Sequence, residues 1–509
     1  MSAASDASRA DTRCVLIVIA VSLAVRLVLA VAVGFSFDES YNVVVSREFQ
    51  LAYFDHPPAI MWLVGAMTHL TGSESHLIVR LPTLLLFTLQ NWLLYRLTTL
   101  AFGARAGLFA VVAISLSPLF IAYFGVIVVT DGPLMCALTG AALYVVRALF
   151  DGRAPWRDWL LAGLWLGLAM LSKFTAVLLL PGLVLFILTV PRHRKLFLTW
   201  PPYVAALVAL LVFSPVIIWN LRHEMSAFVF QGSRAALAID IHVKRVLVHL
   251  AVFIGAIGVL VWPLQMAAVY LGLSNGPRDE RRWFFALLAA IPLLFFLLVD
   301  LFGSQAPDVR AHWGAPGYLM AFPLAGALAV ELSDRFPILF RRTVNLALAA
   351  FALLLAGFVG HAYAGWIGAF APSFAEYDAV VSDQTDWHEL RAVLQRQGLD
   401  AKRSFVLAGR YEFCFKAALV LDKDEPVACL TENPIYKVLA HDDAALLGRD
   451  AIIITDWWNA PQTEADVTAR FRSVEALPPV WMTLHGRPTR QLHLLIARDL
   501  KRPLFGEQR

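Results

Sequence analysis

Two adjacent carboxylates, Asp38 and Glu39, follow directly after the apolar run Val15–Val33. That run is long enough to cross a bilayer as a helix, so the acidic pair is expected at the boundary between lipid and water. Carboxylates are costly in hydrocarbon but suit a polar cavity, where one of them can accept the proton of a reacting hydroxyl. An ordinary solvated loop would contain the same residues, and the pair alone does not separate the two interpretations.

Further residues able to do acid–base or phosphate chemistry occur in several separate connections between apolar runs. They are Asp55, His56, Asp131, Lys173, Arg222, His223, Arg310 and His312. Lysine and arginine neutralise phosphate groups, whereas Asp, Glu and His activate hydroxyls. The set therefore favours transfer chemistry on a substrate that carries a phosphate.

Each of these residues also has an ordinary structural interpretation. Lys173 and Arg310 lie near span ends and could extend to the lipid headgroups. Asp131, before Gly-Pro, is a good helix N-cap residue, which is compatible with a catalytic role. His56 before two prolines fits a turn, and His223 fits a hydrogen-bonded loop histidine. The chemical interpretation gains weight only if all of them lie on one side of a membrane.

The composition indicates a membrane environment for the elements that position these residues. Hydrophobic residues make up 59% of the 509 residues and charged residues only 16%, against about 25% charged in a soluble domain. A net charge of +4 gives no indication of nucleic acid as a partner. The apolar runs predict a polytopic α-helical membrane protein with about eleven transmembrane helices. These helices are expected at 14–34, 77–101, 107–125, 132–150, the two halves of 158–190 divided at Ser172-Lys173, 202–220, 245–272, 283–301, 314–331 and 343–363.

Positive residues in the short connections predict the orientation, because Lys and Arg are enriched in cytoplasmic loops. One set of connections carries Arg105, Arg153, Arg157, Arg192, Arg194, Lys195, Arg278, Arg281, Arg282, Arg335, Arg341 and Arg342. These connections alternate along the chain so that all of them lie on one side, which is predicted to be cytoplasmic. The candidate residues and the C-terminal tail are then expected on the opposite, extracytoplasmic side.

The tail differs in composition from the rest of the chain. Apolar stretches at Ser404–Leu407 and Ala451–Thr455 indicate strands, and Trp387–Arg396 resembles a helix. The tail therefore reads as a small soluble α/β domain. Its two cysteines, Cys414 and Cys429, could pair in an oxidising compartment, but the sequence does not decide this.

Two domains follow from this division. Residues 1–365 are expected to form the transmembrane catalytic domain, in which 35–75 is an outer interfacial segment. That segment contains a half-apolar piece, Ala59 to Leu70, which is too short to cross a bilayer. Residues 366–509 are expected to form the extracytoplasmic α/β domain.

Several motifs resemble the polyprenyl-phosphate-sugar glycosyltransferases of the GT-C fold. The first span ends in FDESYN, and YFDHPPAIMWL is followed by RLPTLL. The motifs TDGPL, LSKFTAVLLLPGL, WNLRHEMSAFVFQ and HWGAPGYL match patterns of the bacterial branch of that family. This branch resembles protein O-mannosyltransferases and includes the aminoarabinose transferase of lipid A and the galacturonic acid transferases of lipopolysaccharide. The resemblance covers about residues 15–330 and extends weakly into the tail at SDQTDWHEL and GRYEFCFKAALVL.

The resemblance implies roles for individual residues. It makes Asp38 the expected catalytic base, with Glu39 and Tyr41 beside it, and Asp131 a second acidic residue of the site. It places Lys173 opposite the lipid phosphate. We expect Arg222 or Arg310 to assist Lys173, and His312 is a further candidate.

Cofactor requirements stay open. Some relatives bind a divalent metal through an acidic residue and a histidine on outer loops. The resemblance therefore implies that Asp55 or His56 could share an ion with His223. The sequence does not complete such a ligand set, so no cofactor is required by it.

The expected activity is transfer of a sugar from a polyprenyl-phosphate donor to a hydroxyl or phosphate of an acceptor, with inversion at the anomeric carbon. The acceptor is expected to be a glycolipid such as lipid A or lipopolysaccharide, or another glycan or a protein. Membrane lipids complete the set of partners, and the resemblance implies a bacterial inner membrane with the site facing the periplasm. A multi-span transporter or lipid flippase is the alternative, although the charges gather on one face and no internal repeat is present.

Overall fold

The structure is a computed structural model of the whole chain. It describes residues 2–152, 155–234, 241–303, 312–370, 378–422, 425–430, 439, 443–456, 460–484 and 486–504. The chain divides into two compact units. The helical unit comprises 1–29, 50–63 and 80–353, and the mixed unit comprises 30–49, 64–79 and 354–509. Arg310, one of the candidate phosphate-binding residues, lies outside the described residues.

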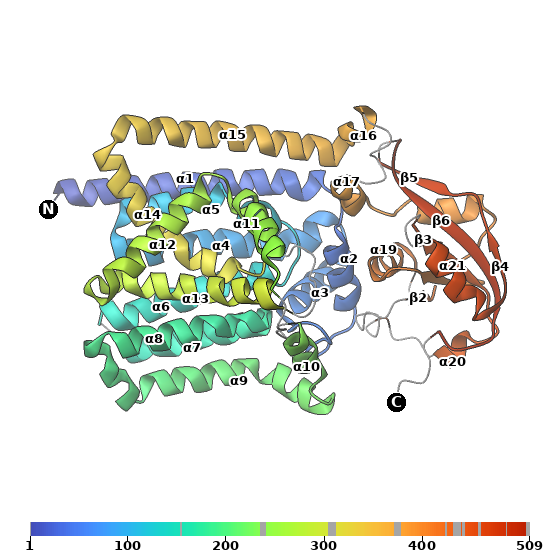
Figure 1. Cartoon of the computed structure of the whole chain (residues 1–509), viewed down its shortest axis with the longest axis horizontal. Coiled ribbons are helices and arrows are strands. Elements are labelled where there is room, and N and C mark those ends of the chain that lie inside the picture. The colour runs from blue at the N-terminus through green and yellow to red at the C-terminus, as the bar shows by residue number, and fades with distance from the viewer. Residues whose placement is uncertain are drawn as a thin grey trace. The chain divides into compact units, whose positions relative to one another are not determined.

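The helical unit is a bundle of long apolar helices (Figure 1). A helix satisfies its backbone hydrogen bonds internally, which is what a chain in lipid requires. The α-helices that belong wholly or mainly to this unit are α1 (Ser2–Ala32), α4 (His76–Phe102), α5 (Ala104–Ser115), α6 (Asp131–Phe150), α7 (Pro155–Ser172), α8 (Leu179–Thr189), α9 (Pro201–Arg222), α10 (Ser226–Ser233), α11 (Val243–Ile257), α12 (Val261–Asn275), α13 (Glu280–Phe302), α14 (Ala315–Arg335) and α15 (Pro337–Ala364). A π-helical turn at Leu119–Phe124 and 3₁₀ segments at Phe174–Leu178, Pro191–Leu198 and Gly276–Arg278 complete the unit.

Among the described residues, seven helices are long and apolar enough to cross a membrane, or up to nine if each of two bent pairs forms one span. The expectation of a polytopic helical membrane protein is confirmed, and the expected spans all fall on helices. The expected span at 245–272 is divided into α11 and α12, which are bent by 107°. Gly258 ends α11 with a φ of 110°, a conformation that suits glycine and stops a helix. The expected span at 107–125 is likewise shorter, because α5 ends at Ser115 and a π-helical turn follows.

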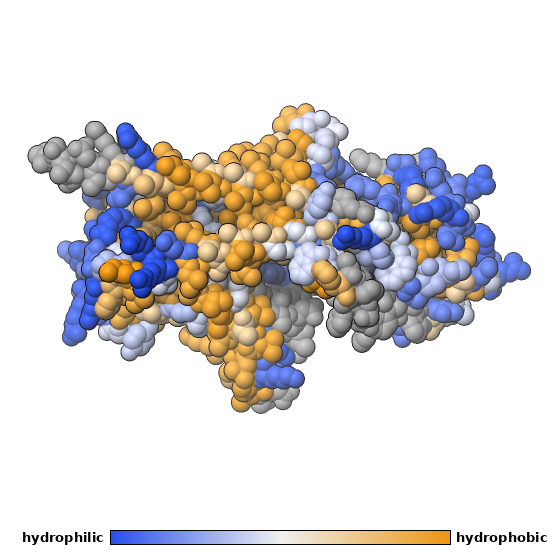
Figure 2. All heavy atoms as spheres, turned by 90° about the horizontal axis from the view of Figure 1, so that it is seen from above, coloured by the Kyte–Doolittle hydropathy of each residue, from blue (hydrophilic) through white to orange (hydrophobic). Residues whose placement is uncertain are grey.

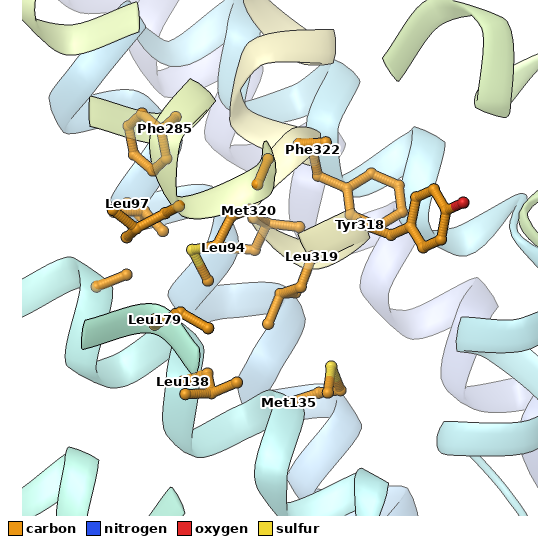
Figure 3. Packing of buried hydrophobic residues seen from close by; sticks show 14 of the residues in the cluster. Leu94, Leu97, Met135, Leu138, Leu179, Phe285, Tyr318, Leu319, Met320 and Phe322 are labelled. Carbon is orange, nitrogen blue, oxygen red and sulfur yellow. The ribbon is translucent and has the colours of Figure 1, made fainter. Parts of the chain in front are cut away.

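The core of the helical unit is formed by apolar side chains from most of its helices. Figure 3 shows Leu94 and Leu97 of α4 among side chains of α6, α8, α13 and α14. Figure 2 shows that the outer surface of this unit is also largely hydrophobic on the face in view. Leu346 and Leu353 of α15 are 65% and 75% exposed. A surface apolar to this extent needs lipid around it.

Ion pairs bring several of the described arginine-rich connections together at one end of the helical unit. Arg105 in the first turn of α5 pairs with Asp334 near the end of α14 at 2.8 Å. Arg282 at the start of α13 pairs with Glu331 of α14. Arg192 pairs with Glu280 in the same way, from the turn after α8 to the start of α13. These ion pairs join connections of the set that was expected on the cytoplasmic side.

The mixed unit contains a six-stranded sheet with helices packed around it (Figure 1). Its strands are β1 (Phe405–Ala408), β2 (Val427–Cys429), β3 (Ala451–Thr455), β4 (Phe471–Ala476), β5 (Val480–Leu484) and β6 (Arg487–Leu500). The strand order is β2-β1-β3-β6-β4, with β5 also pairing with β6. β1 is parallel to β2 and β3, whereas β6 is antiparallel to its neighbours. The expected small α/β region near the C-terminus is confirmed, with strands and a helix at the three predicted stretches.

The helices of the mixed unit come from both ends of the chain. They are α2 (Phe37–Ser46), most of α3 (Ala59–Thr71), α16 (Trp366–Phe370), α17 (Ala379–Gln384), α18 (Leu390–Arg396), α19 (Tyr411–Val420), α20 (Asp443–Leu446) and α21 (Ala460–Thr468). α19 packs against α2. Cys414 of α19 and Cys429 of β2 form a disulfide with their Cα atoms 5.7 Å apart. The mixed unit therefore includes the segment that carries Asp38.

Candidate active site

A buried ion pair joins two of the predicted residues in the helical unit. The Lys173 Nζ donates a hydrogen bond to the Asp131 Oδ2 at 2.7 Å, although the two residues are 42 positions apart. Asp131 is 2% exposed and Lys173 9%. An ion pair at this depth is kept because it is well paired, and such pairs inside a membrane protein mark functional sites.

Local structure explains how the two side chains meet. α6 begins at Asp131, where the exposed backbone N–H groups of a helix start favour a carboxylate. α7 ends at Ser172, and Lys173 is extended, with φ −159° and ψ 140°, before the 3₁₀ segment Phe174–Leu178. The break at Ser172-Lys173, visible in the sequence, therefore turns the lysine toward the start of α6.

Both members of the ion pair have hydrogen-bonding groups that the pair itself does not use. The Asp131 Oδ1 is buried and has no hydrogen-bond partner among the described residues. The Lys173 ammonium has three donors, and it forms a single side-chain hydrogen bond to the residues that the structure describes. Buried polar groups are normally satisfied, so an unsatisfied oxygen beside a cation indicates a place for a polar ligand.

Other predicted residues of the helical unit lie apart from this pair. Asp55 is buried, and its Oδ2 lies 3.5 Å from the His56 Nε2, while the Gln231 side chain donates to its backbone oxygen. His223 stacks on Trp219 at 4.0 Å between ring centroids. Its Nδ1 lies 2.7 Å from the Trp219 carbonyl oxygen, which favours the ordinary structural interpretation of this histidine.

Arg222 and His312 complete the predicted set in this unit. Arg222 lies in the last turn of α9 and is exposed, so its charge is available to a ligand at the membrane surface. The His312 ring lies 5.7 Å from the Tyr123 ring. Neither residue forms a hydrogen bond or ion pair with Asp131 or Lys173 within the described part of the chain.

The acidic pair of the mixed unit divides into two different environments. Glu39 is fully buried and closes a capping box with Ser36: its Oε2 accepts the Ser36 N–H at 2.9 Å, and the Ser36 Oγ accepts the Glu39 N–H at 3.2 Å. Asp38, one residue earlier in the first turn of α2, is exposed. The carboxylate of Glu39 is therefore used to start the helix, and that of Asp38 faces outward.

Tyr41 has an anchoring position on the same helix. It is 8% exposed, and its ring packs edge-on against Phe415 of α19 at 4.8 Å between centroids. This contact joins the buried side of α2 to α19. The side chain thus supports the helix that carries Asp38.

Residues near the C-terminus hold the turn before α2. The Phe35 N–H donates to the Asp386 Oδ1 at 2.9 Å, and the Phe37 N–H donates to the Asp383 Oδ1 at 2.8 Å. Lys416, 1% exposed, donates to the carbonyl oxygens of Phe35, Asp383 and Thr385. We call Asp383, Asp386 and Lys416 the clamp, because together they fix the backbone on both sides of Ser36.

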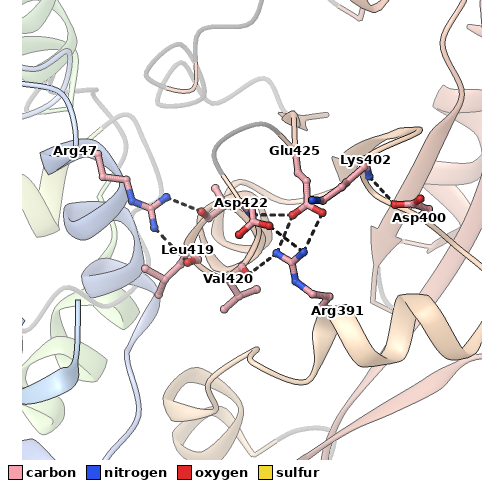
Figure 4. Close-up of polar contacts among 9 residues, drawn as sticks. Arg47, Arg391, Asp400, Lys402, Leu419, Val420, Asp422 and Glu425 are labelled. Carbon is pink, nitrogen blue, oxygen red and sulfur yellow. Dashed lines mark hydrogen bonds and ion pairs between the residues drawn. The ribbon is translucent and has the colours of Figure 1, made fainter. Parts of the chain in front are cut away.

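The far end of α2 is fixed in the same manner. Arg47, after the last turn, donates to the carbonyl oxygens of Ala418 and Leu419 at the end of α19. Figure 4 shows Arg47 beside Leu419. It also pairs with Glu74 at 2.7 Å. Arg391 of α18 in turn pairs with Glu425 at 2.9 Å. Both ends of α2 are therefore tied to the C-terminal part of the mixed unit.

The two acidic residues of the clamp differ in their electrostatics. Burial raises the pKa of Asp383 to about 6, an effect that the charges of Asp38 and Glu39 increase and that Lys416 opposes. Burial would also raise the pKa of Asp386, but the adjacent His76 and the Phe35 N–H outweigh it and lower that pKa. Asp383 thus carries a charge that the fold disfavours.

Sequence reasoning did not identify the clamp. Its residues lie within SDQTDWHEL and GRYEFCFKAALVL, where the family resemblance was noted but no function was assigned. A lysine within an apolar, helix-forming stretch was the available signal, because a buried lysine needs several acceptors. The partners could not be named, since the Phe37 N–H and Asp383 are 346 positions apart.

Metal binding by the residues considered from the sequence receives no support from the geometry. Within the described residues, Asp55, His56 and His223 do not bring three ligand atoms close enough to share an ion. A different group, formed by His76, Asp386 and His388, does bring three ligand atoms close together.

The fold and these sites define the class to which the chain is similar: membrane glycosyltransferases of the GT-C fold. The family described as dolichyl-phosphate-mannose-protein mannosyltransferase matches residues 55–219. The expected resemblance to this class is therefore confirmed, and the comparisons favour a glycosyltransferase over a transporter.

Particular relatives narrow the comparison. The lipid A galacturonosyltransferase RgtD of Rhizobium johnstonii is 26% identical over 301 residues, which are 58% of this chain and 60% of RgtD. The match thus spans less than two thirds of that relative. ArnT from Cupriavidus metallidurans in the apo state has a TM-score of 0.67 at 17% identity, covering 96% of this chain and 98% of ArnT. The same protein bound to undecaprenyl phosphate also gives 0.67 at 17% identity, over 98% of this chain and 100% of ArnT, and these likenesses show the shared fold.

Proposed function

We propose that this protein transfers a sugar from a polyprenyl-phosphate donor to a glycolipid acceptor of the lipid A or lipopolysaccharide type. The observation that carries the proposal is the separation of the acidic pair: Glu39 is buried in a capping box, while Asp38 is exposed on a clamped helix start. A fixed but accessible carboxylate is what a general base requires. The likenesses to ArnT bound to undecaprenyl phosphate and to the lipid A galacturonosyltransferase RgtD support this class of donor and acceptor.

The buried ion pair has the complementary role in this proposal. Lys173 donates a hydrogen bond to the phosphate oxygen on which negative charge develops as the bond between sugar and phosphate breaks. Asp131 orients the lysine. The bond between the anomeric carbon and the phosphate oxygen breaks, and its electron pair stays on the phosphate. The acceptor oxygen attacks the opposite face of the sugar, so the configuration inverts, and Asp38 takes the hydroxyl proton. Arg222 adds positive charge for the phosphate.

The chemical nature of the acceptor determines how much Asp38 contributes. A hydroxyl needs a base, because it is a weak nucleophile until its proton is removed. A phosphate monoester is largely ionised near neutral pH and needs little such help. Replacement of Asp38 should therefore cost much more activity with a hydroxyl acceptor than with a phosphate acceptor.

The orientation is part of the proposal. We infer that Asp131, Lys173 and the mixed unit face the periplasm of a bacterial inner membrane. The arginine-rich connections at one end of the helical unit support this through the positive-inside rule. The disulfide between Cys414 and Cys429 supports it as well, because disulfides persist in oxidising compartments.

The test uses purified full-length protein in lipid nanodiscs with a panel of polyprenyl-phosphate sugars and a lipopolysaccharide extract. Wild type is expected to release polyprenyl phosphate and to increase the acceptor mass by one sugar. Asp38→Asn should lower the rate with a hydroxyl acceptor by a factor of about 10² to 10⁴ without changing the melting temperature.

Glu39→Gln is the matched control in this test. It perturbs the buried capping box, so it should lower the melting temperature yet retain much more activity than Asp38→Asn. Equal turnover by wild type and Asp38→Asn would remove Asp38 as the base. If no donor of the panel is consumed, a lipid-scrambling assay on the same protein in vesicles tests the transporter alternative.

A further inference from the structure

Three potential metal ligands converge in the mixed unit. His76 is the first residue of α4, and Asp386 and His388 lie between α17 and α18. The Asp386 Oδ2 lies 2.9 Å from the His76 Nε2 and 3.9 Å from the His388 Nε2. Ligand atoms of all three side chains lie within 4.8 Å of one another.

The carboxylate is held with one oxygen toward the imidazoles. The Asp386 Oδ1 accepts the Phe35 N–H at 2.9 Å, which leaves the Oδ2 facing His76 and His388. The Phe35 ring packs edge-on against His76 at 4.4 Å between centroids. Supporting contacts of this kind are what orient metal ligands in protein sites.

One nitrogen of the cluster is buried without a hydrogen bond. The His76 Nε2 lies close to the Asp386 Oδ2, yet the arrangement does not satisfy hydrogen-bond geometry, and this nitrogen has no other partner among the described residues. A histidine nitrogen and a carboxylate oxygen that lie this close without hydrogen-bond geometry can share a cation.

We propose that His76, Asp386 and His388 bind one zinc ion. Two imidazole nitrogens and one carboxylate oxygen are a common zinc ligand set, and zinc distances near 2.0–2.2 Å place ligand atoms about 3.3 Å apart. The separations of 2.9 and 3.9 Å bracket that value. The side chain of His388 is 71% exposed, so water can occupy a fourth position.

The ion would link the start of α4 to the segment that holds Phe35. Since Asp386 binds both the ion and the Phe35 N–H, zinc would stiffen the turn that precedes Asp38. This consequence depends on the proposed function, but zinc binding itself does not. The site also differs from the group of Asp55, His56 and His223 that the family resemblance suggested.

The experiment measures zinc directly on full-length protein purified with a tag that contains no histidine. The protein is treated with a chelator, dialysed against zinc and analysed by elemental mass spectrometry. Wild type should retain about one zinc per chain, and His76→Ala, His388→Ala and Asp386→Asn should fall to background. His69→Ala is the matched control, because His69 is an exposed histidine of the same unit outside the cluster.

Thermal unfolding gives a second measurement. Zinc should raise the melting temperature of wild type and of His69→Ala by several degrees, and should not raise that of His388→Ala. His388 is so exposed that its replacement leaves the fold intact. Wild type that retains no more zinc than His388→Ala would overturn the proposal and leave a simple ion pair between His76 and Asp386. Equal zinc loss in His69→Ala would overturn it too. Zinc retained without glycosyl transfer would refute the proposed function alone.

Discussion

The Asp131–Lys173 pair and the clamp both bury charged groups, but the two buried lysines differ in how many of their hydrogen-bond donors are used. In the helical unit one hydrogen bond joins the two charges, and an Asp131 oxygen stays unsatisfied among the described residues. In the mixed unit the Lys416 ammonium donates to three backbone carbonyl oxygens. Lys416 uses all three of its donors, whereas within the part of the chain that the structure describes Lys173 uses one.

This difference indicates that the clamp supports the backbone and that Lys173 can bind a ligand. A saturated ammonium cannot accept a ligand without breaking contacts that hold the backbone, so the clamp stabilises the turn before α2. An ammonium with unused donors can bind a phosphate without losing its partner. We therefore expect substitutions in the two regions to separate activity from stability in different ways.

Among substitutions of the two buried lysines, the larger effect on turnover is expected for Lys173→Met. Loss of the cation should lower turnover by a factor of about 10² to 10³, because it removes charge stabilisation of the leaving phosphate. It should also destabilise the protein by about 3–5 kcal/mol, since Asp131 is left buried and unpaired. Donor turnover and thermal unfolding measure the two effects.

The double variant Asp131→Asn/Lys173→Met decides between binding and support. Removal of both charges should restore most of the stability but none of the activity. Recovery of turnover together with stability would mean that the pair only holds α6 and α7 together.

Lys416→Met is expected to affect mainly stability and to lower turnover only weakly. Three carbonyl oxygens lose a charged donor, so the melting temperature should fall strongly, by an amount corresponding to about 3 kcal/mol. Turnover should fall only about tenfold, through looser positioning of Asp38, while KM for the donor stays unchanged. Lys402→Met, an exposed lysine in the same unit, is the control and should be neutral. An unchanged melting temperature in Lys416→Met would show that the clamp does not hold the turn.

The sequence predicted the helical unit better than the clamp for a physical reason. Long apolar runs must be helical in lipid, so the spans could be placed from hydropathy alone. The bend between α11 and α12 was missed because a single residue, Gly258, creates it within a continuous apolar run. Asp131 and Lys173 were identified separately, from a helix start and a helix break, although their ion pair depends on how α6 and α7 pack.

The segment around Asp38 and Glu39 shows which contacts a local sequence pattern can reveal and which it cannot. Ser36 and Glu39 are three positions apart, which is the spacing of a capping box. This local pattern could have assigned Glu39 a structural role. The hydrogen bond from the Phe35 N–H to Asp386 spans 351 positions, so no local pattern could reveal it. The structural role of Glu39 was therefore open to a local pattern, whereas the way the turn before Asp38 is held becomes visible only in the folded unit.

Asp383→Asn is expected to change stability in a pH-dependent way. The pKa of Asp383 rises from its ordinary value of 3.8 to about 6 through burial, so the folded state holds its proton more tightly than the unfolded state. Stability from this group is present below pH 4 and is lost as the pH rises through about 6, with a ceiling of about 3 kcal/mol. Its partial exposure makes that figure an upper bound.

The asparagine variant retains an oxygen for the Phe37 N–H and carries no charge. It should melt higher than wild type at pH 7.5 and show less decline between pH 4 and 6. Melting curves across this range provide the measurement. Parallel pH profiles for the two proteins would mean that the Asp383 charge is not disfavoured by the fold.

The smallest effect is expected for Arg222→Gln, which tests how far the phosphate-binding region extends from Lys173. Arg222 is exposed at the end of α9, so solvent and salt screen its charge and its removal should leave the melting temperature unchanged. KM for the donor should rise about three- to fivefold at low salt, and the difference should shrink at high ionic strength while kcat stays constant. A KM that is unchanged at low salt would restrict phosphate binding to the buried lysine, whereas a large fall in kcat would place Arg222 at the reacting phosphate itself.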